Sequence, residues 1–282
     1  MRSGPWPPRP EPLPSPVVDN HAHLEWEAGD TPRSVAERLA DAAVAGVTRV
    51  VQIGCEIDSA RWTAEEVLRH PSLVGGVALH PNEAPLHADG THASGLSYED
   101  AFAEIAELAR GERIRVVGET GLDFFRTGPE GVEAQRRSFR DHIALAKELG
   151  LTLQIHDREA HAEILEVLDA DGAPEHTVMH CFSGNAAFAR ECLDRGLYLS
   201  FAGTVTFANA PHLREAASVT PASRLLVETD APFLTPTPHR GKPNSPEQVA
   251  TTVRVLAEAR GDDLTALCEA IDANSQALYG PW

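Results

Sequence analysis

The sequence predicts a single (β/α)8 barrel, the architecture also called a TIM barrel. Eight short runs rich in apolar and β-branched residues alternate with longer amphipathic segments, and 282 residues is the usual size for one such barrel. The turn after the first expected strand is unlike the GxGxxG loop that a doubly wound open sheet would favour. We therefore expect one closed parallel barrel over residues 17–282, preceded by a Pro-rich, poorly ordered arm over residues 1–16.

The expected elements alternate along the whole chain. The strands cover residues 16–23, 47–54, 73–80, 114–119, 151–156, 177–182, 197–201 and 224–230. The helices cover about 33–45, 58–69, 98–110, 131–150, 159–169, 185–195 and 209–218, and two more begin near Pro246 and Asp262. The clearest is 131–150, where Phe139, Ile143 and Ala146 recur at spacings of four and three and Gly150 is placed to end the helix.

Composition narrows the class of protein. The formal net charge of −18 argues against a broad basic surface for nucleic acid, although a small pocket can differ from the surface in sign. No apolar run approaches the roughly 18 residues of a membrane span, and residues 1–16 lack the apolar stretch of a secretion signal. The four cysteines form no CxxC pair, which suits a reducing compartment. We expect a cytoplasmic protein without a membrane partner; the oligomeric state stays open, with a monomer favoured.

The stretch VVDNHAHLEW places two histidines where the first strand ends. Side chains of a strand alternate with period two, so His21 and His23 point the same way. Two neutral imidazoles about 6–7 Å apart on such a face can converge on one divalent cation. Taken alone, the pair is explained equally well as two polar residues where a strand leaves the core.

Polar, metal-binding residue types stand at the ends of most other expected strands. In a parallel barrel these ends open onto one mouth, where so many buried imidazoles and carboxylates need a shared partner. We therefore interpret the two histidines of the first strand as a ligand pair. The strand-end residues are His21, His23, His80, Glu119, His156, His180, Glu228 and Asp230. Most of the other histidines are expected on the solvated surface, namely His70, His87, His92, His142, His161, His176 and His212.

This mixture of nitrogen and oxygen ligands suits Zn²⁺, Mn²⁺ or Mg²⁺. The set exceeds what one ion takes, so we expect two ions about 3.5–4 Å apart, with Glu119 able to bridge them. Asp230 is placed to orient an activated water and take its proton while also touching a metal. Cys181 could be a nucleophile, but it alternates away from the metal face and is expected in the core.

Three cationic side chains are expected near the same mouth: Arg158, Arg240 and Lys242. Arginine forks match phosphate oxygens, so with a two-metal centre they favour a phosphoester over a neutral amide. The alternative for each is an ordinary charge on a surface loop. Phe124 and Phe125 could stack on a base at the rim, although core or lid packing explains them equally well.

Taken together, these stretches resemble the TatD family of metal-dependent deoxyribonucleases. The matching segments are DNHAHL (19–24), ALHPN (78–82), GETGLDFF (118–125), QRRSFRDHIALAKELGLTLQIHDR (135–158), HCFSG (180–184) and ETDAPFLTP with RGKPNSP (228–246). The resemblance implies a TIM-barrel hydrolase and Mg²⁺-supported hydrolysis of DNA phosphodiesters, described for members as 3′→5′ exonuclease action. It implies as metal ligands His21, His23, Glu119, His156, His180 and Asp230.

Two positions depart from the family pattern. Asn82 stands where a second histidine is common, which leaves His80 as the imidazole of that loop and weakens a phosphate-binding role there. Thr120 stands where an aliphatic residue is usual, which affects packing more than chemistry.

Three functions follow for comparison. The first is hydrolysis of phosphodiester bonds at DNA ends, with single-stranded or terminal DNA preferred because the surface is acidic. The second keeps the metal but acts on a small metabolite, as an amidohydrolase or esterase; such barrels often carry a modified lysine after strand four, where this chain has Glu119. The third is a non-catalytic barrel stabilised by metal. We expect the first.

Overall fold

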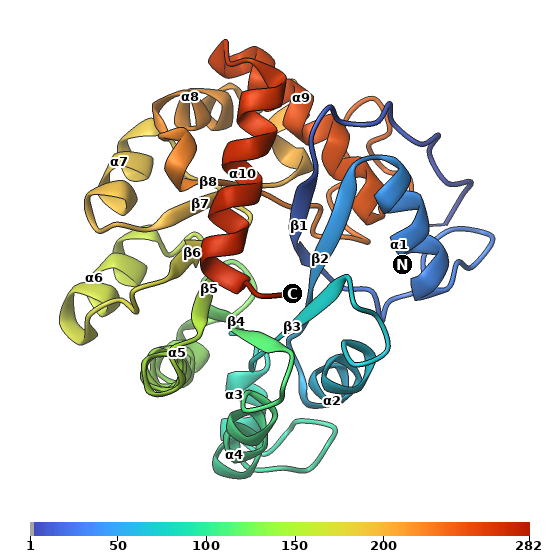
Figure 1. The fold of residues 1–282 in the computed structure, drawn as a ribbon. Helices are drawn as coiled ribbons and strands as arrows, with labels where there is room; N and C mark the ends of the chain where they lie inside the picture. The colour runs from blue at the N-terminus through green and yellow to red at the C-terminus, as the bar shows by residue number, and fades with distance from the viewer. Residues whose placement is uncertain (1–2) are drawn as a thin grey trace.

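The computed structural model describes residues 3–282 and confirms the predicted barrel. Eight parallel strands form one sheet whose neighbours follow chain order from first to last, and helices surround it (Figure 1). The barrel closes where the end of the first strand forms backbone hydrogen bonds with the residues that follow the last strand. The His23 N–H donates to the Ala231 carbonyl at 2.8 Å, and the Asp230 N–H donates to the His21 carbonyl at 2.9 Å.

The strands are β1 Val17–Ala22, β2 Val47–Gly54, β3 Leu73–Val77, β4 Ile114–Asp123, β5 Thr152–Arg158, β6 Thr177–Met179, β7 Tyr198–Phe201 and β8 Leu225–Val227. The helices are α1 Val35–Val44, α2 Ile57–Glu66, α3 Ala84–Ala88, α4 Tyr98–Leu108, α5 Val132–Leu149, α6 His161–Asp171, α7 Ala186–Asp194, α8 Pro211–Val219, α9 Val249–Arg260 and α10 Leu264–Tyr279. Four short 3₁₀ turns lie at Pro129–Gly131, Gly203–Thr206, Ala222–Arg224 and Pro246–Gln248. None of these helices combines the length and the hydropathy that crossing a bilayer requires.

The element ends differ from the sequence prediction mainly on the side of the mouth. β4 runs on to Asp123 because its last four residues pair with β5, from Thr120 opposite Ile155 to Asp123 opposite Arg158. Glu119 therefore lies inside a strand. In contrast β3, β6 and β8 end before their polar residues, so His80, His180 and Asp230 stand on the turns that follow. The short helix α3 was not predicted.

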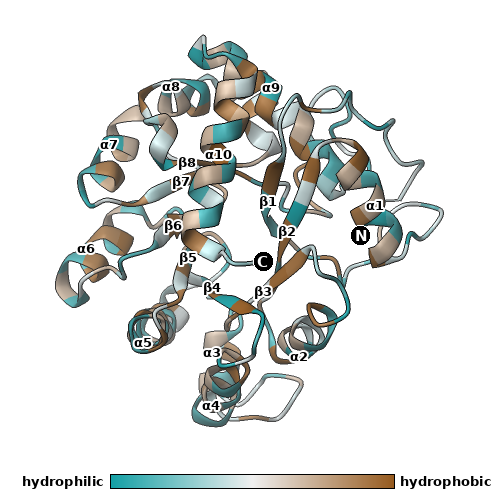
Figure 2. Ribbon diagram, in the orientation of Figure 1, coloured by the Kyte–Doolittle hydropathy of each residue, from teal (hydrophilic) through white to brown (hydrophobic). Residues whose placement is uncertain are grey.

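The core has two parts. Between sheet and helices lies a large apolar layer, to which α5 contributes Phe139 and Ile143 at the predicted spacing. Inside the barrel a smaller cluster contains Val18, Val51, Val74, Val116, Val178 and Leu226. Figure 2 shows the hydrophobic colour along β3, and mixed colours along β2 and α10.

The C-terminal end of α10 closes the barrel opposite the mouth. Leu278 and Tyr279 are buried with the interior cluster, and the C-terminus lies at the centre of the ring in Figure 1. The Tyr279 hydroxyl donates to Asn20 Oδ1 and accepts from Gln154 Nε2 at 3.1 Å. The floor of the barrel is thus tied to polar side chains of β1 and β5.

The Pro-rich arm, predicted to be poorly ordered, contains no helix or strand over residues 3–16. It lies against the barrel, where Leu13 is buried and its N–H donates to the Ala45 carbonyl at 3.0 Å. Trp6 Nε1 donates to the Thr31 carbonyl at 2.8 Å, and the Arg33 guanidinium lies 4.6 Å from the centre of the Trp6 ring.

Candidate metal centre

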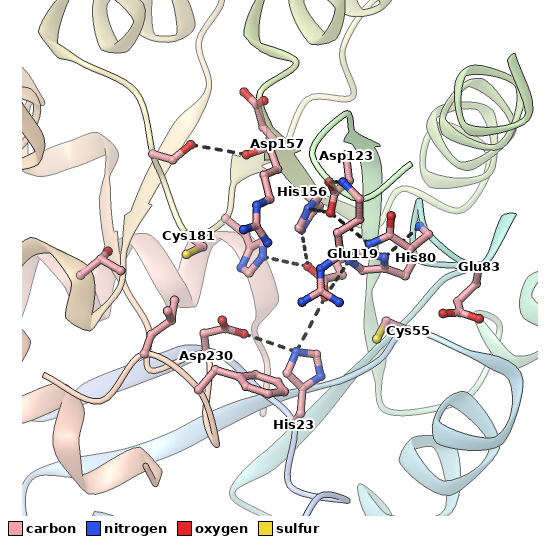
Figure 3. Close-up of a pocket in the computed structure, with 18 of the residues that line it drawn as sticks. His23, Cys55, His80, Glu83, Glu119, Asp123, His156, Asp157, Cys181 and Asp230 are labelled. Atoms are coloured by element: carbon pink, nitrogen blue, oxygen red, sulfur yellow. Dashed lines mark hydrogen bonds and ion pairs between the residues drawn. The ribbon is translucent and has the colours of Figure 1, made fainter. Parts of the chain in front are cut away.

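A cavity of about 560 Å³ opens at the carboxyl ends of the strands. Its size is within the range of about 300–1,000 Å³ that is usual for small-ligand sites. The side chains in Figure 3 reach it from strand ends and turns all around the barrel. Imidazoles and carboxylates form its base, where His23, His80, Glu119, Asp123, His156, His180 and Asp230 line it.

His21 and His23 point toward one another, as the strand period predicts. Their Nε2 atoms lie 3.2 Å apart, while His21 Nδ1 lies 2.8 Å from Gln154 Oε1 and His23 Nδ1 lies 3.0 Å from the Ile53 carbonyl. Because both partners of the Nδ1 atoms are acceptors, the Nδ1 atoms donate to them and both Nε2 atoms face the shared space. Two nitrogens that ligate one tetrahedral zinc ion at about 2.0–2.1 Å would stand about 3.3 Å apart, so this spacing fits a common cation.

The carboxylate of Glu119 lies at the centre of the cluster. Its Oε2 is 2.8 Å from His180 Nε2 and 3.2 Å from His156 Nδ1. Its Oε1 faces the other way, 3.7 Å from His80 Nε2 and 3.8 Å from His23 Nε2. Each oxygen therefore faces its own pair of imidazoles, as a carboxylate that bridges two cations must.

Asp230 completes the base of the cavity beside the first histidine pair. Its Oδ1 lies 3.4 Å from His23 Nε2 and 4.0 Å from His21 Nε2, and its side chain keeps 15% of its surface exposed. The backbone of Asp230 has a φ of +51°, and Cys181 and Leu234, also on the cavity wall, have positive φ as well. Such conformations are unfavourable outside glycine and tend to gather at functional sites.

A second layer of side chains holds the imidazoles in place. Glu228 Oε1 accepts from His180 Nδ1 at 2.9 Å, and Glu228 Oε2 accepts from the Ser200 hydroxyl at 2.5 Å. On the opposite wall, His156 Nε2 lies 3.3 Å from Asp123 Oδ2, which also accepts from Asn82 Nδ2 at 3.0 Å. Carboxylates that accept from the second nitrogen of a histidine fix its tautomer and orientation.

The imidazoles differ in their proton affinity. Burial, with the nearby charge of His180, holds the pKa of His21 well below its usual range, and burial lowers the pKa of His80 to about 3. Burial opposes protonation of His23 too, but a hydrogen bond with Asp230 and the charge of Glu25 raise its pKa to about 9.

The carboxylate at the centre is ionised. Burial raises the pKa of Glu119, but the charges of His180 and His80 hold it well below its usual range. In His180 the charges of Glu228 and Glu119 outweigh burial and raise the pKa well above its usual range. Protons thus offset the buried negative charge here, and divalent cations would offset the same charge by displacing them.

Around His21 and Glu119, three groups of side chains have ligand atoms close enough to share an ion. The groups overlap, because His21 belongs to two of them and Glu119 to two, and each contains at least one imidazole and one carboxylate. Their donors fit a divalent cation such as Zn²⁺, Mn²⁺ or Mg²⁺. The groups are His21, His23 and Asp230; His21, Glu119 and His180; and His80, Glu119 and His156. Together they contain all six sequence-predicted ligands and His80.

The three predicted cations do not share one location. Arg158, at the end of β5, lines the cavity with its guanidinium 4.0 Å from the centre of the Phe125 ring. Arg240 and Lys242 are exposed on the loop after β8 and are not among the lining residues. Arg240 instead stacks on Phe207 at 4.3 Å from the ring centre. The structure therefore does not bring these two residues into the cavity, because the loop carries them outward.

Two histidines predicted on the surface are buried. His142 is fully buried in α5, where its Nε2 accepts from the Leu79 N–H at 3.1 Å, and His87 is 1% exposed in α3. His142 lies three residues after Phe139 and four before Ala146, so the apolar spacing of that helix already placed it on the core face. The short helix that carries His87 gave no such signal.

Cys181 also differs from the prediction. It lines the cavity and is half-buried, because it lies on the turn after β6 with a φ of +44°, where the alternation of a strand no longer applies. Burial raises the pKa of this thiol well above its usual range, so the thiolate needed for nucleophilic attack is disfavoured. All four cysteines are free thiols.

Sequence reasoning missed Asp123 and Arg126. Asp123 is 1% exposed, and it accepts from the backbone N–H groups of Phe125 and Arg126 as well as from Asn82. The segment GLDFF gave no clear signal because the aspartate followed the expected end of the strand. Asn82, noted as a departure from the family, anchors this carboxylate.

Comparisons with known proteins identify the family of this chain. A family described as "TatD related DNase" matches residues 18–280. The chain belongs to the TatD family. It is 42% identical over 271 residues to an uncharacterized metal-dependent hydrolase TatD of Mycobacterium tuberculosis, covering 94% of this chain and 98% of that protein. It is 33% identical over 246 residues to a protein of Citrobacter koseri named 3′-5′ ssDNA/RNA exonuclease TatD, covering 85% of this chain and 90% of that protein.

Solved structures share the barrel fold. The TatD homologue YJJV of Escherichia coli superposes with a TM-score of 0.83 at 27% identity, covering 94% of this chain and 98% of the other. A phosphotriesterase homology protein of Escherichia coli, solved with phosphate in its active site, shares the fold at a TM-score of 0.67 and 15% identity, over 95% and 99% of the two chains. This chain is accordingly a metal-dependent hydrolase of the TatD family.

Proposed function

We propose that this TatD protein hydrolyses the terminal phosphodiester bond of an unpaired DNA 3′ end and releases nucleotides one at a time. The observation that carries the proposal is the position of the Glu119 carboxylate, whose Oε1 and Oε2 face different pairs of imidazoles. A bridging carboxylate suits two cations about 3.5–4 Å apart, which is an arrangement common in enzymes of phosphoryl transfer.

His21, His23 and Asp230 would hold one cation with Glu119, and His156 and His180 would hold the other. Mg²⁺ is our choice for the ion in function, with Mn²⁺ and Zn²⁺ as alternatives. Bound cations supply Lewis-acid polarisation of a phosphoryl oxygen and lower the pKa of a coordinated water. His80, whose Nε2 lies 3.7 Å from Glu119 Oε1, would contact substrate phosphate beside them.

Asp230 is the group we assign to proton transfer. Its carboxylate is partly exposed at the base of the cavity, and its Oδ1 lies beside the first histidine pair. In the hydrolysis, a water oxygen attacks phosphorus and the P–O3′ bond breaks. Asp230 accepts the proton that the water loses, and a proton from solvent completes the hydroxyl on the departing O3′. The products would be a nucleoside 5′-phosphate and a shortened strand with a 3′-hydroxyl.

Three observations support a DNA end as substrate over long duplex. The cavity of about 560 Å³ matches a small ligand or a strand terminus in size, and Arg158 on its wall offers a phosphate fork. The net charge of −18 disfavours wrapping of duplex. The name of the Citrobacter koseri relative gives single-stranded nucleic acid and the 3′→5′ direction for that protein.

The test is a metal-restoration assay. Protein stripped of metal is supplied with Mg²⁺, Mn²⁺ or Zn²⁺ singly and incubated with end-labelled single- and double-stranded oligonucleotides of one sequence, together with p-nitrophenyl acetate and an N-acetyl amino acid as ester and amide substrates. We expect a ladder from the 3′ end of the single strand, and no ladder from Glu119→Ala or Asp230→Asn protein with an unchanged circular dichroism spectrum.

Several results would contradict the proposal. Full nuclease activity in both variants would refute the assigned centre. Hydrolysis of the ester or amide while the oligonucleotides stay intact would favour the small-metabolite hydrolase. Tight metal binding without hydrolysis of any substrate would favour the non-catalytic barrel.

A further inference from the structure

The mouth of the barrel has an aromatic side. Trp26 follows β1 and Phe233 follows β8, which are neighbouring strands where the barrel closes. Both line the cavity, with their ring centres 6.0 Å apart and their planes at 64°. Trp26 is 41% exposed and Phe233 is 38% exposed. Exposed aromatic faces beside a polar site are suited to stack on a flat ligand.

The opposite side of the mouth is cationic. Arg158 ends β5 and Arg126 lies just beyond β4, and both line the cavity. Among residues 3–282, neither guanidinium lies within ion-pair distance of a carboxylate. In a barrel ordered from β1 to β8, the pair β4 and β5 lies across from β8 and β1. Figure 3 shows the same separation, with His23 and Asp230 on one side and Asp157 on the other.

An acidic groove lies on the outer side of Trp26. It measures about 400 Å³, and Glu27, Glu56 and Asp58 line it together with Trp26 and Trp62. Phosphates would meet like charge in this groove, and like charges cost free energy even at a surface. A nucleic acid backbone therefore has a favourable route on the arginine side and an unfavourable one beyond Trp26.

From this arrangement we infer that a nucleic acid end crosses the mouth in one orientation. The terminal base lies against Trp26 and Phe233, the upstream phosphates run over Arg158 and Arg126, and the scissile phosphodiester lies between them above Glu119. The inference rests on the proposed function and adds its substrate orientation. It also predicts a preference for an unpaired terminal base, because a paired base has no free face to offer the indole.

The first experiment removes the base and the indole in turn. Steady-state kcat/KM is measured with Mg²⁺ for a single-stranded hexanucleotide and for the same strand with an abasic 3′ residue, using wild type, Trp26→Ala, Trp26→Phe and Trp62→Ala. Stacking on an aromatic side chain changes affinity by about 5- to 150-fold. For the wild-type enzyme, we expect removal of the terminal base to lower kcat/KM by a factor within that range. For Trp26→Ala, the same change of substrate should lower kcat/KM much less.

The controls separate stacking from structure. Trp26→Phe keeps an aromatic face and should keep most of the discrimination, and Trp62→Ala, which removes an indole that does not line the cavity, should keep all of it. The coupling between Trp26 and the terminal base is the decisive quantity. Equal losses from the abasic end in wild type and Trp26→Ala would overturn the inference while the proposed function stands. No hydrolysis of either strand by wild type would overturn both.

The second experiment tests the cationic side. We expect Arg126→Ala to reduce the slope of log kcat/KM against log salt concentration by about 0.7 for the hexanucleotide, as loss of one phosphate contact to a single strand does. A dinucleotide has no upstream phosphates and should show no change. Arg136→Ala removes an exposed arginine that pairs with Glu133 and serves as the matched control. An unchanged slope with the hexanucleotide would contradict the assigned path.

Discussion

Glu228 Oε1 accepts a hydrogen bond from His180 Nδ1 at 2.9 Å, and this contact determines which nitrogen of His180 faces the cavity. Glu228 is itself fully buried and is held by the Ser200 hydroxyl and Asn20 Nδ2. It is therefore a positioning residue that acts through the imidazole of His180. The other nitrogen of that ring, Nε2, lies 2.8 Å from Glu119 Oε2.

Glu228→Gln should weaken metal binding without unfolding the barrel. The amide keeps an acceptor oxygen but loses the negative charge that strengthens the hydrogen bond, and such changes cost about 10- to 100-fold in metal affinity. Competition of Zn²⁺ between the protein and a chromophoric chelator measures the affinity directly. Wild-type affinity in a folded variant would mean that His180 needs no such support.

The arginines after different strands should differ in their effect on catalysis. Arg158→Ala removes a cation from the cavity wall, so kcat/KM for an oligonucleotide should fall by at least tenfold. Arg240→Ala and Lys242→Ala change exposed residues outside the cavity lining and should each stay within about twofold of wild type. A larger loss in the latter two would restore the sequence-based prediction that all three cations serve the substrate.

His142 should make the fold less stable in mild acid. Burial lowers its pKa to about 4, whereas an unfolded histidine titrates near 6.5. Between these values the unfolded chain takes up a proton that the folded chain does not, so stability is lost as the pH falls from about 6.5 toward 4. The loss at pH 4.5 is about 2.5 kcal/mol from this group.

The check on His142 compares how much unfolding free energy the wild type and a variant lose between two pH values. Urea unfolding at pH 7.5 and 4.5 gives the loss of unfolding free energy for wild type and for His142→Gln, and the other histidines contribute equally to both. The variant should be less stable at pH 7.5 but should lose about 2.5 kcal/mol less on acidification. Parallel losses in the two proteins would show that His142 titrates normally.

Tyr279→Phe should weaken the floor of the barrel. The hydroxyl joins Asn20 and Gln154, and its removal takes away two buried hydrogen bonds while Gln154 keeps its bond to the Asn20 carbonyl at 2.8 Å. A cost of about 1–2 kcal/mol in unfolding free energy follows. Urea denaturation measures it, and an unchanged midpoint with an unchanged slope would contradict it.

The fold and most of the cluster could be predicted because both depend on local patterns. Strand periodicity placed His21 and His23 on one face, and the rule that parallel strands end at one rim brought Glu119 and His156 to the same place. These inferences needed no knowledge of the loops.

The parts that could not be predicted depend on loops and on the neighbours of a residue. Asp123 required the pairing of β4 with β5 past the expected strand end. Arg240 lay near the mouth in sequence order, yet its loop carries it outward onto Phe207. Cys181 followed a strand, but the backbone turn after β6 changed its direction. The helix spacing of His142 predicts its burial, whereas its residue type alone predicts the surface.

The side chain of Gln154 connects the two ends of the barrel. Its Nε2 donates to the Tyr279 hydroxyl, and its Oε1 lies 2.8 Å from His21 Nδ1. If the last turn of α10 frays on heating, Gln154 loses one of its anchors and His21 is held less firmly. Heat inactivation of this protein should then begin when the last turn of α10 detaches from the floor of the barrel, before the surrounding helices unfold.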